Sequence, residues 1–211
     1  MPRISAATIS EHRAQTEERI LAAVSRLARE RGIDEISMTE VAAAAGITRT
    51  VLYNYFPDKA ALLLAFTERV TSYFIQRYEA ELPTDATAAV RLSAFVHLQL
   101  EGLMAHPHPA AAELGATLGP DAYQALADHV APMQRVLCDI VQAGMDSGEF
   151  DETDAEGASR LILAAIGAQR VPLLRGQTTL DEAWAAVARF TLRALGVDRA
   201  AVAELVAPPR S

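Results

Sequence analysis

The sequence from Ser37 to Lys59, SMTEVAAAAGITRTVLYNYFPDK, constrains the fold more than any other part of this chain. It predicts two short helices joined by a tight turn, followed by the start of a third helix. Glu40 follows Ser37 by three residues, which is the spacing of a capping box at the start of a helix. Gly46 predicts the left-handed backbone conformation that ends a helix. A short helix of small residues is therefore expected between Ser37 and Gly46.

The second short helix is expected to begin immediately after the turn. Thr48 is its predicted N-cap, and Arg49 and Thr50 fall in its exposed first turn. Leu52 and Phe56 are expected in the core, because a short helix needs apolar side chains that bury it. A short helix, a turn containing glycine and a second helix with a polar first turn are typical of a DNA-binding helix-turn-helix. In such a motif the second helix lies in the major groove.

The candidate DNA contacts come from these two helices and the start of the next one. Arg49 can donate two hydrogen bonds to guanine, while threonines beside it can meet phosphates or a thymine methyl group. A half-buried structural role explains Tyr55 equally well, and simple solvation explains Thr39 equally well. The predicted DNA-binding residues are Thr39, Thr48, Arg49, Thr50, Tyr53, Tyr55 and Lys59.

The charge of the chain is unevenly distributed. The net charge is −8, but residues 1 to 60 hold eight basic and eight acidic residues, so the excess acid lies entirely in the rest of the chain. The global field therefore repels phosphate, and affinity for DNA must come from a local patch.

At the residues described above the chain resembles the TetR family of bacterial transcriptional regulators. The family pattern is a helix ending in Gly and Val or Ile, a recognition helix closing on Leu-Tyr-x-Tyr-Phe, and a turn before a Lys. Here it reads Gly46-Ile47, Leu52-Tyr53-Asn54-Tyr55-Phe56 and Pro57-Asp58-Lys59, with Arg19 to Ala23 and Gly32 resembling the family's first helix and its end. The resemblance covers roughly residues 15 to 65. The family often has Gly at the position of Thr50, so operator preference is expected to differ.

The whole chain is predicted to be all-α, with about nine helices. We expect a three-helix DNA-binding domain over residues 1–58 and a helical effector-binding and dimerisation domain over residues 59–211. Met1 to Ile9 lacks a helical pattern and is expected to form an arm, and Ala200 to Ser211 is expected to fray. The other expected helices run from Ser10 to Arg31, Lys59 to about Glu81, Thr84 to Ala105, Ala110 to Leu118, Asp121 to about Ser147, Thr153 or Asp154 to about Leu174, and Asp181 to Leu195.

The TetR resemblance implies a cavity among the middle helices that binds a small effector. Apolar and aromatic residues mixed with a few polar ones suit such a pocket, although each of them suits an ordinary core as well. The predicted ligand-binding residues are Phe66, Tyr73, Phe74, Phe95, Gln99, Met104, Tyr123, Met133, Gln142 and Trp184.

A homodimer is expected on three grounds. The last two long helices carry alanines that allow close approach, so they can pair with the same two helices of a second copy. The TetR resemblance implies that dimer. Independently, a helix-turn-helix gains specificity by reading two half-sites about one DNA turn, or a multiple of it, apart.

Catalytic and cofactor motifs are missing from the sequence. It has no Gly-x-Ser-x-Gly, P-loop or Gly-rich dinucleotide turn, so neither an enzyme nor a cofactor is expected. His106-Pro107-His108-Pro109 has no matching ligand spacing, so no metal is expected either. A single cysteine, Cys138, no apolar run of 18 residues and no signal peptide favour a soluble, cytoplasmic protein.

The sequence thus predicts a ligand-responsive DNA-binding transcriptional regulator, most simply a repressor that a small hydrophobic effector releases from a palindromic operator. A helical enzyme that binds a small molecule and a protein-interaction adaptor that keeps the helix-turn-helix as a scaffold are the alternatives.

Overall fold

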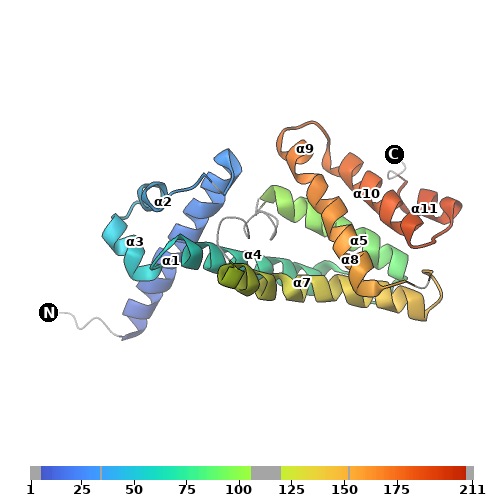
Figure 1. The fold of residues 1–211 in the computed structure, drawn as a ribbon, viewed down its shortest axis with the longest axis horizontal. Helices are drawn as coiled ribbons and strands as arrows, with labels where there is room; N and C mark the ends of the chain where they lie inside the picture. The colour runs from blue at the N-terminus through green and yellow to red at the C-terminus, as the bar shows by residue number, and fades with distance from the viewer. Residues whose placement is uncertain (1–5, 34, 106–119, 152, 208–211) are drawn as a thin grey trace. The chain divides into compact units, whose positions relative to one another are not determined.

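The computed structural model describes residues 6–33, 35–105, 120–151 and 153–207, and all regular secondary structure in these ranges is helical (Figure 1). The all-α prediction is therefore confirmed. The helices are α1 (Ala6–Arg31), α2 (Met38–Ala45), α3 (Arg49–Tyr55), α4 (Lys59–Glu81), α5 (Ala88–Ala105), α7 (Pro120–Asp146), α8 (Ala155–Ala168), α9 (Arg170–Leu174), α10 (Leu180–Ala194) and α11 (Arg199–Leu205).

The described residues form two compact units. The first holds the residues up to Val70 and those from 120 to His129, and the second holds Thr71–Ala105 and the residues from Val130 onward. Helices α4 and α7 contribute residues to both units. The domain boundary expected after residue 58 stays a prediction.

Helix α1 is longer than expected at its start. It begins at Ala6 rather than at Ser10, so the predicted arm is helical over its last four residues. Ala6 and Ala7 explain the extension, because alanine has the highest intrinsic helix propensity. Residues 1–5 lie outside the described part of the chain.

Helix α5 begins four residues later than expected, at Ala88 rather than Thr84. The carboxylate of Glu149 accepts hydrogen bonds from the backbone amides of Ala88 and Ala89, at 2.6 and 3.1 Å. The first amides of a helix have no partner within that helix, so the carboxylate satisfies two of them. Its negative charge also interacts favourably with the positive end of the helix dipole. A residue about sixty positions further along the chain therefore stabilises the start of α5 at Ala88.

The predicted helix from Asp154 to Leu174 is in fact two helices, α8 and α9. Pro172 accounts for the break. Proline lacks the amide that would bond the carbonyl four residues earlier, and its ring collides with that carbonyl, which here belongs to Ala168. Helix α8 ends at Ala168, and α9 begins at Arg170.

The expectation that the chain frays from Ala200 onward was wrong up to Leu205. Helix α11 is capped by Asp198, whose carboxylate accepts from the Ala200 amide at 2.7 Å. Val202 and Val206 are buried and anchor this segment in the second unit. The predicted short helix over 110–118 and the His106–Pro109 segment lie outside the described residues.

The core of the second unit forms around α5, which packs against α8, α9 and α10. The indole Nε1 of Trp184 on α10 donates to the carbonyl oxygen of Ser93 on α5 at 3.1 Å. Gly102 allows the Phe74 ring to lie against α5, because a Cβ at this position would overlap the ring. Over the described residues, none of the helices combines the length and the apolar character needed to cross a membrane.

Candidate nucleic-acid interface and effector unit

Local hydrogen bonds define the two helices of the predicted helix-turn-helix. The Ser37 amide donates to Glu40 Oε2 at 3.0 Å and the Glu40 amide donates to Ser37 Oγ at 3.3 Å, so the capping box is confirmed. Gly46 ends α2 in the left-handed conformation, with φ 67° and ψ 36°. Thr48 caps α3, because its Oγ1 accepts from the Val51 amide at 3.3 Å. Hydrogen bonds between residues close in sequence therefore define both the end of α2 and the start of α3.

Two arginines of α1 bind the end of α2. Arg19 Nη2 donates to the Ala45 carbonyl oxygen at 3.1 Å, and Arg26 Nη2 donates to the Ala44 carbonyl oxygen at 3.0 Å. These carbonyls have no partner within α2, and a cation at a helix C-terminus is favourable. Arg19 and Arg26 thus hold α1 against α2. These two contacts were not predicted from the sequence, although the seven-residue spacing places both arginines on one helix face.

The first turn of α3 presents polar side chains to solvent. Thr48, Arg49 and Thr50 are exposed, while Leu52, further along α3, is fully buried. The burial predicted for Leu52 and Phe56 is confirmed. Thr39, in the first turn of α2, is also exposed. An exposed polar turn on a helix that is anchored by a buried leucine can be inserted into a DNA groove without unfolding the module.

Each of the two tyrosines of α3 lies beside an arginine. The Arg49 guanidinium lies 5.7 Å from the Tyr53 ring centroid, and Arg49 Nη2 donates to Tyr53 Oη at 3.3 Å. Tyr53 is 41% exposed, so its hydroxyl group remains accessible. Tyr55 is half-buried, and the Arg13 guanidinium of α1 lies 5.0 Å from its ring centroid. Cation–π contacts of this kind hold the arginines near the surface of α3.

Helix α4 begins where the sequence predicted. Asp58 Oδ1 accepts from the Ala61 amide at 2.8 Å, which is an N-cap contact, and Lys59 is the first residue of the helix. Lys59 is half-buried. The assignment of Lys59 and of the other candidates to DNA contact stays a prediction.

The capping box makes part of the stability of the DNA-binding unit dependent on pH. Hydrogen bonds from the Ser37 side chain and amide, together with Arg31, lower the pKa of Glu40 below its ordinary value of 4.5. A lowered pKa means that this contribution is present above pH 4.5 and is lost as the pH falls through the folded-state pKa. We expect Glu40→Gln, which keeps the cap but does not titrate, to lose less stability between pH 5 and pH 3 than the wild type, measured by urea unfolding. Glu35→Gln serves as the control, and equal acid losses in wild type and Glu40→Gln would contradict the assignment.

The predicted ligand-binding residues differ widely in exposure. Phe66, which belongs to the first unit, is buried, as are Phe74, Phe95, Gln99 and Met133 of the second unit. Tyr73 and Trp184 are half-buried, whereas Met104 and Gln142 are exposed. The side chain of Tyr123 lies outside the described part. Membership of a pocket stays a prediction for all of them, including Gln142, which donates to Asp146 Oδ1 at 2.8 Å.

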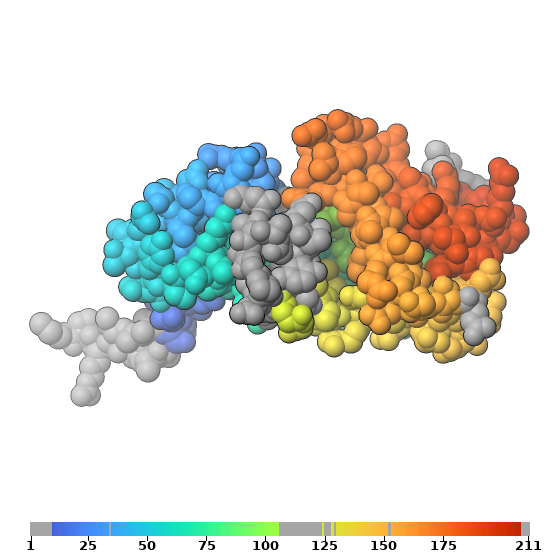
Figure 2. Space-filling model, viewed as in Figure 1, coloured from blue at the N-terminus to red at the C-terminus, as the bar shows by residue number. Residues whose placement is uncertain are grey.

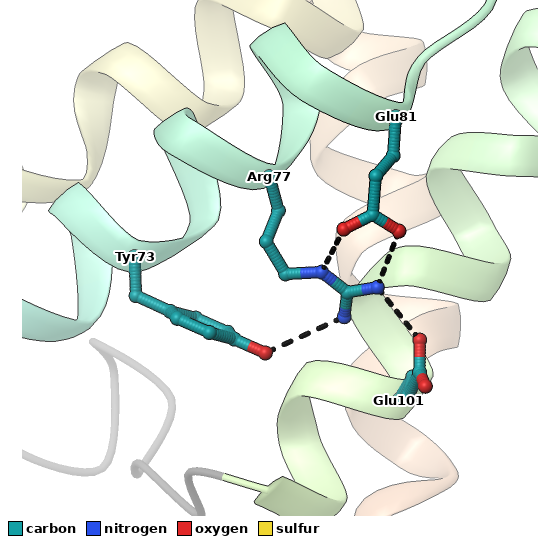
Figure 3. Close-up of polar contacts among 4 residues, drawn as sticks. All are labelled: Tyr73, Arg77, Glu81 and Glu101. Atoms are coloured by element: carbon teal, nitrogen blue, oxygen red, sulfur yellow. Dashed lines mark hydrogen bonds and ion pairs between the residues drawn. The ribbon is translucent and has the colours of Figure 1, made fainter.

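A polar cluster that the sequence analysis missed links α4 to α5 (Figure 3). Arg77 Nε and Nη2 each donate to one carboxylate oxygen of Glu81 at 2.7 Å, and Nη2 also donates to Glu101 on α5 at 2.8 Å. Arg77 Nη1 donates to the Tyr73 hydroxyl at 3.4 Å. The hydrogen bonds to Glu81 raise the pKa of Arg77 and lower that of Glu81. The four-residue spacing from Tyr73 to Arg77 to Glu81 could have indicated the part within α4.

Two surface grooves occur in the second unit. One, of about 370 Å³, is lined by residues that include Glu81, His97 and Trp184. The other, of about 520 Å³, lies between α8 and α10 and is lined by residues that include Leu161 and Phe190. Leu161 is 72% exposed and Phe190 is 65% exposed. Both side chains line this groove, so they belong to one apolar surface. Helices α8 and α10 are in contact and lie side by side on the face shown in Figure 2.

A helix-turn-helix with an exposed recognition turn, joined through α4 to a second helical unit, defines the class of helix-turn-helix transcription regulators. The sequence matches the bacterial regulatory proteins of the tetR family over residues 20–66, and the tetracyclin repressor-like C-terminal domain over residues 88–190. The chain belongs to the TetR family.

Individual relatives agree with this membership. The chain is 29% identical to the HTH-type transcriptional regulator Rv1255c of Mycobacterium tuberculosis, over 69% of this chain and 70% of that protein. It is 35% identical to the HTH-type transcriptional regulator EthR of Mycolicibacterium smegmatis, over 47% of this chain and 45% of that protein. The solved structure of RolR in complex with resorcinol has the same fold, with a TM-score of 0.64 at 22% identity, over 96% of this chain and 98% of RolR.

Proposed function

We propose that this protein is a homodimeric repressor that binds a palindromic operator and leaves it when a small effector binds the second unit. The observation that carries the proposal is the first turn of α3. Arg49 and the threonines beside it are exposed there, while Leu52 holds the same helix in the core. This arrangement suits base readout from a rigid support. Such a regulator works on chromosomal DNA, so we place it in the cytoplasm and assign it no catalysis.

The apolar surface of α8 and α10 supports the homodimer. Leu161 and Phe190 are 72% and 65% exposed, so both apolar side chains are in contact with water in a single copy. A two-fold axis would bring the same surface of a second copy against it and remove that area from water. Two recognition helices would then be held at the separation that the half-sites of an operator require.

Effector response is supported by the course of α4 and by a structural neighbour. Helix α4 begins after the Asp58 cap in the first unit and reaches the Arg77 cluster in the second, so one helix contributes residues to both units. RolR, which shares the fold, was solved with resorcinol. In our proposal a ligand in the second unit favours another position of α4. Such couplings are typically worth about 1–3 kcal/mol.

Selection of bound fragments from random DNA tests the proposal directly. We expect an inverted repeat whose half-sites are separated by about one helical turn or a multiple of it. Fragments without any shared sequence would reject the assignment of sequence-specific binding. A single unrepeated site would reject the homodimer instead.

We expect Arg49→Ala to weaken binding to the selected operator by roughly 1–3 kcal/mol and to relax its sequence preference, because a bidentate contact to guanine would be lost. Lys59→Ala is the matched comparison. This substitution would remove a phosphate contact, so DNA of any sequence should bind more weakly. The slope of the logarithm of the affinity against the logarithm of the salt concentration should fall in magnitude by about one. Fluorescence anisotropy at several salt concentrations, on operator and scrambled DNA, measures both. Unchanged operator affinity in Arg49→Ala would show that Arg49 does not read bases.

A further inference from the structure

The second unit contains buried polar atoms that have no hydrogen-bond partner among the described residues, and three of them lie on α4 and on the second half of α5. They are Thr71 Oγ1, Tyr78 Oη and Gln99 Nε2. Tyr78 is 4% exposed and Gln99 is 3% exposed, so water does not reach these groups freely. More than nine in ten buried polar groups in proteins are paired, so three unpaired groups on two neighbouring helices are unusual.

The three groups follow a single seam between α4 and α5. Thr71, Phe74 and Tyr78 are spaced three and four residues apart, so they lie on one face of α4. On α5, Gln99 comes one turn after Phe95. The Tyr78 ring centroid lies 4.9 Å from that of Phe95 and 6.0 Å from that of Phe74. The seam is therefore aromatic, with polar groups distributed along it.

The hydroxyl group of a helical threonine does not have to remain unpaired. Thr67, one turn before Thr71 on the same helix, is also buried, and its Oγ1 donates to the Leu63 carbonyl oxygen at 2.9 Å. Thr71 makes no such bond to its own helix, so its hydroxyl group is available to another molecule. Burial raises the pKa of Tyr78, so its phenol stays protonated and can both donate and accept.

We infer that this seam binds the oxygen atoms of an uncharged aromatic effector, such as a phenol or an aryl alcohol. The inference rests on the proposed function and names the chemical class of the effector. Gln99 Nε2 needs an acceptor, and an ammonium group has none. Hydroxyl oxygens can satisfy all three groups, and an aromatic ring matches Phe74, Tyr78 and Phe95.

Nearby charge disfavours a carboxylate in the seam. Arg77, the residue before Tyr78, already binds Glu81 and Glu101, so this cluster carries excess negative charge. Arg91 lies on the same face of α5 as Gln99, but it precedes it by two turns, or about 12 Å along the helix. Among the described residues, a carboxylate bonded to Gln99 would therefore be buried beside no cation that is not already bound to other carboxylates, which is unfavourable.

In the protein without a bound effector, the unpaired buried groups should lower the melting temperature. Tyr78→Phe and Thr71→Val each remove an unpaired hydroxyl group, so we expect the melting temperature to rise by about 2–4 °C in each. Thr67→Val is the matched control, because it removes a paired hydroxyl group and should lower the melting temperature. If an ordered water satisfied the seam, Tyr78→Phe and Thr71→Val would also lower it, and that result would overturn the inference.

Binding is tested by calorimetry on the full chain with three probes that share a 3-hydroxyphenyl ring. Resorcinol is neutral, 3-hydroxybenzoate is an anion and 3-hydroxybenzylamine is a cation at neutral pH. We expect resorcinol to bind at least about tenfold more tightly than either charged probe. Its affinity should fall at least tenfold in Tyr78→Phe and in Gln99→Leu, and should be unchanged in Thr67→Val.

Three results would overturn the inference: tighter binding of a charged probe, equal binding of resorcinol to wild type and both seam variants, or binding of none of the probes. Selection of operator DNA is a separate experiment, and it tests the proposed function independently of effector binding. An inverted repeat together with failed probe binding would reject the effector class and leave the regulator function standing. The expected probe pattern without any selected DNA would reject the function and retain the site.

Discussion

Leu161→Asp is expected to give a folded monomer that binds the selected operator at least about 100-fold more weakly than the wild type. The side chain is 72% exposed in a single copy, so the substitution should not disturb the protomer. In a dimer formed through α8 and α10 it would bury an unpaired carboxylate, which costs several kcal/mol, and each 1.4 kcal/mol is a factor of about ten in affinity. Sedimentation equilibrium measures the oligomer, and anisotropy measures operator binding.

Phe190→Asp should reproduce this result from the other helix of the same surface. Ala201→Asp is the control, because it adds the same charge at an exposed position of α11 outside the groove. We expect Ala201→Asp to remain a dimer with wild-type operator affinity. A dimeric Leu161→Asp protein with full affinity would place the dimer interface elsewhere.

Leu52→Ala is expected to lower the free energy of unfolding by about 2–5 kcal/mol, because it leaves a cavity beneath α3. Leu52 has no exposed surface, and it is the buried residue of α3, so no other buried side chain of this helix can close the space. Urea unfolding followed by circular dichroism measures the loss. Val51→Ala, at the neighbouring half-buried position, is the control and should lose less than half as much.

Leu52→Ala also distinguishes a residue that holds α3 in place from a residue that reads bases. We expect Leu52→Ala to bind operator more weakly in proportion to the fraction unfolded, and to recover at low temperature or with excess DNA, because DNA binds the folded form. Arg49→Ala should show no such recovery. A Leu52→Ala protein with wild-type stability would mean that α3 is not held in place by this leucine.

Local chemistry made the DNA-binding unit predictable from the sequence. The capping box, the left-handed glycine and the Thr48 cap each involve residues no more than four positions apart, so their hydrogen bonds depend on spacing alone. Thr50 and Leu52 are two residues apart, so the helical period places them on opposite sides of α3 once those ends are set. For the same reason the start of α4 at Lys59 was correct.

Long-range contacts account for what the sequence analysis missed. The start of α5 at Ala88 depends on Glu149, and the α1 contacts to α2 depend on arginines about twenty residues away. Helix α11 is stable because Val202 and Val206 are buried in the core of the second unit. The break before α9 is different, since Pro172 is visible in the sequence and its position should have placed the end of α8.

By itself the sequence determined the all-helical class, the caps of the DNA-binding helices and which side of α3 is exposed, because these depend on neighbours along the chain. Only the tertiary structure decided that Arg77 joins α4 to α5 and that Leu161 and Phe190 share one apolar surface. It also decided that Tyr78 Oη and Gln99 Nε2 are buried without a hydrogen-bond partner in the part of the chain that the structure describes. Each of those features depends on two helices meeting, and helical spacing within one helix does not specify the face of another.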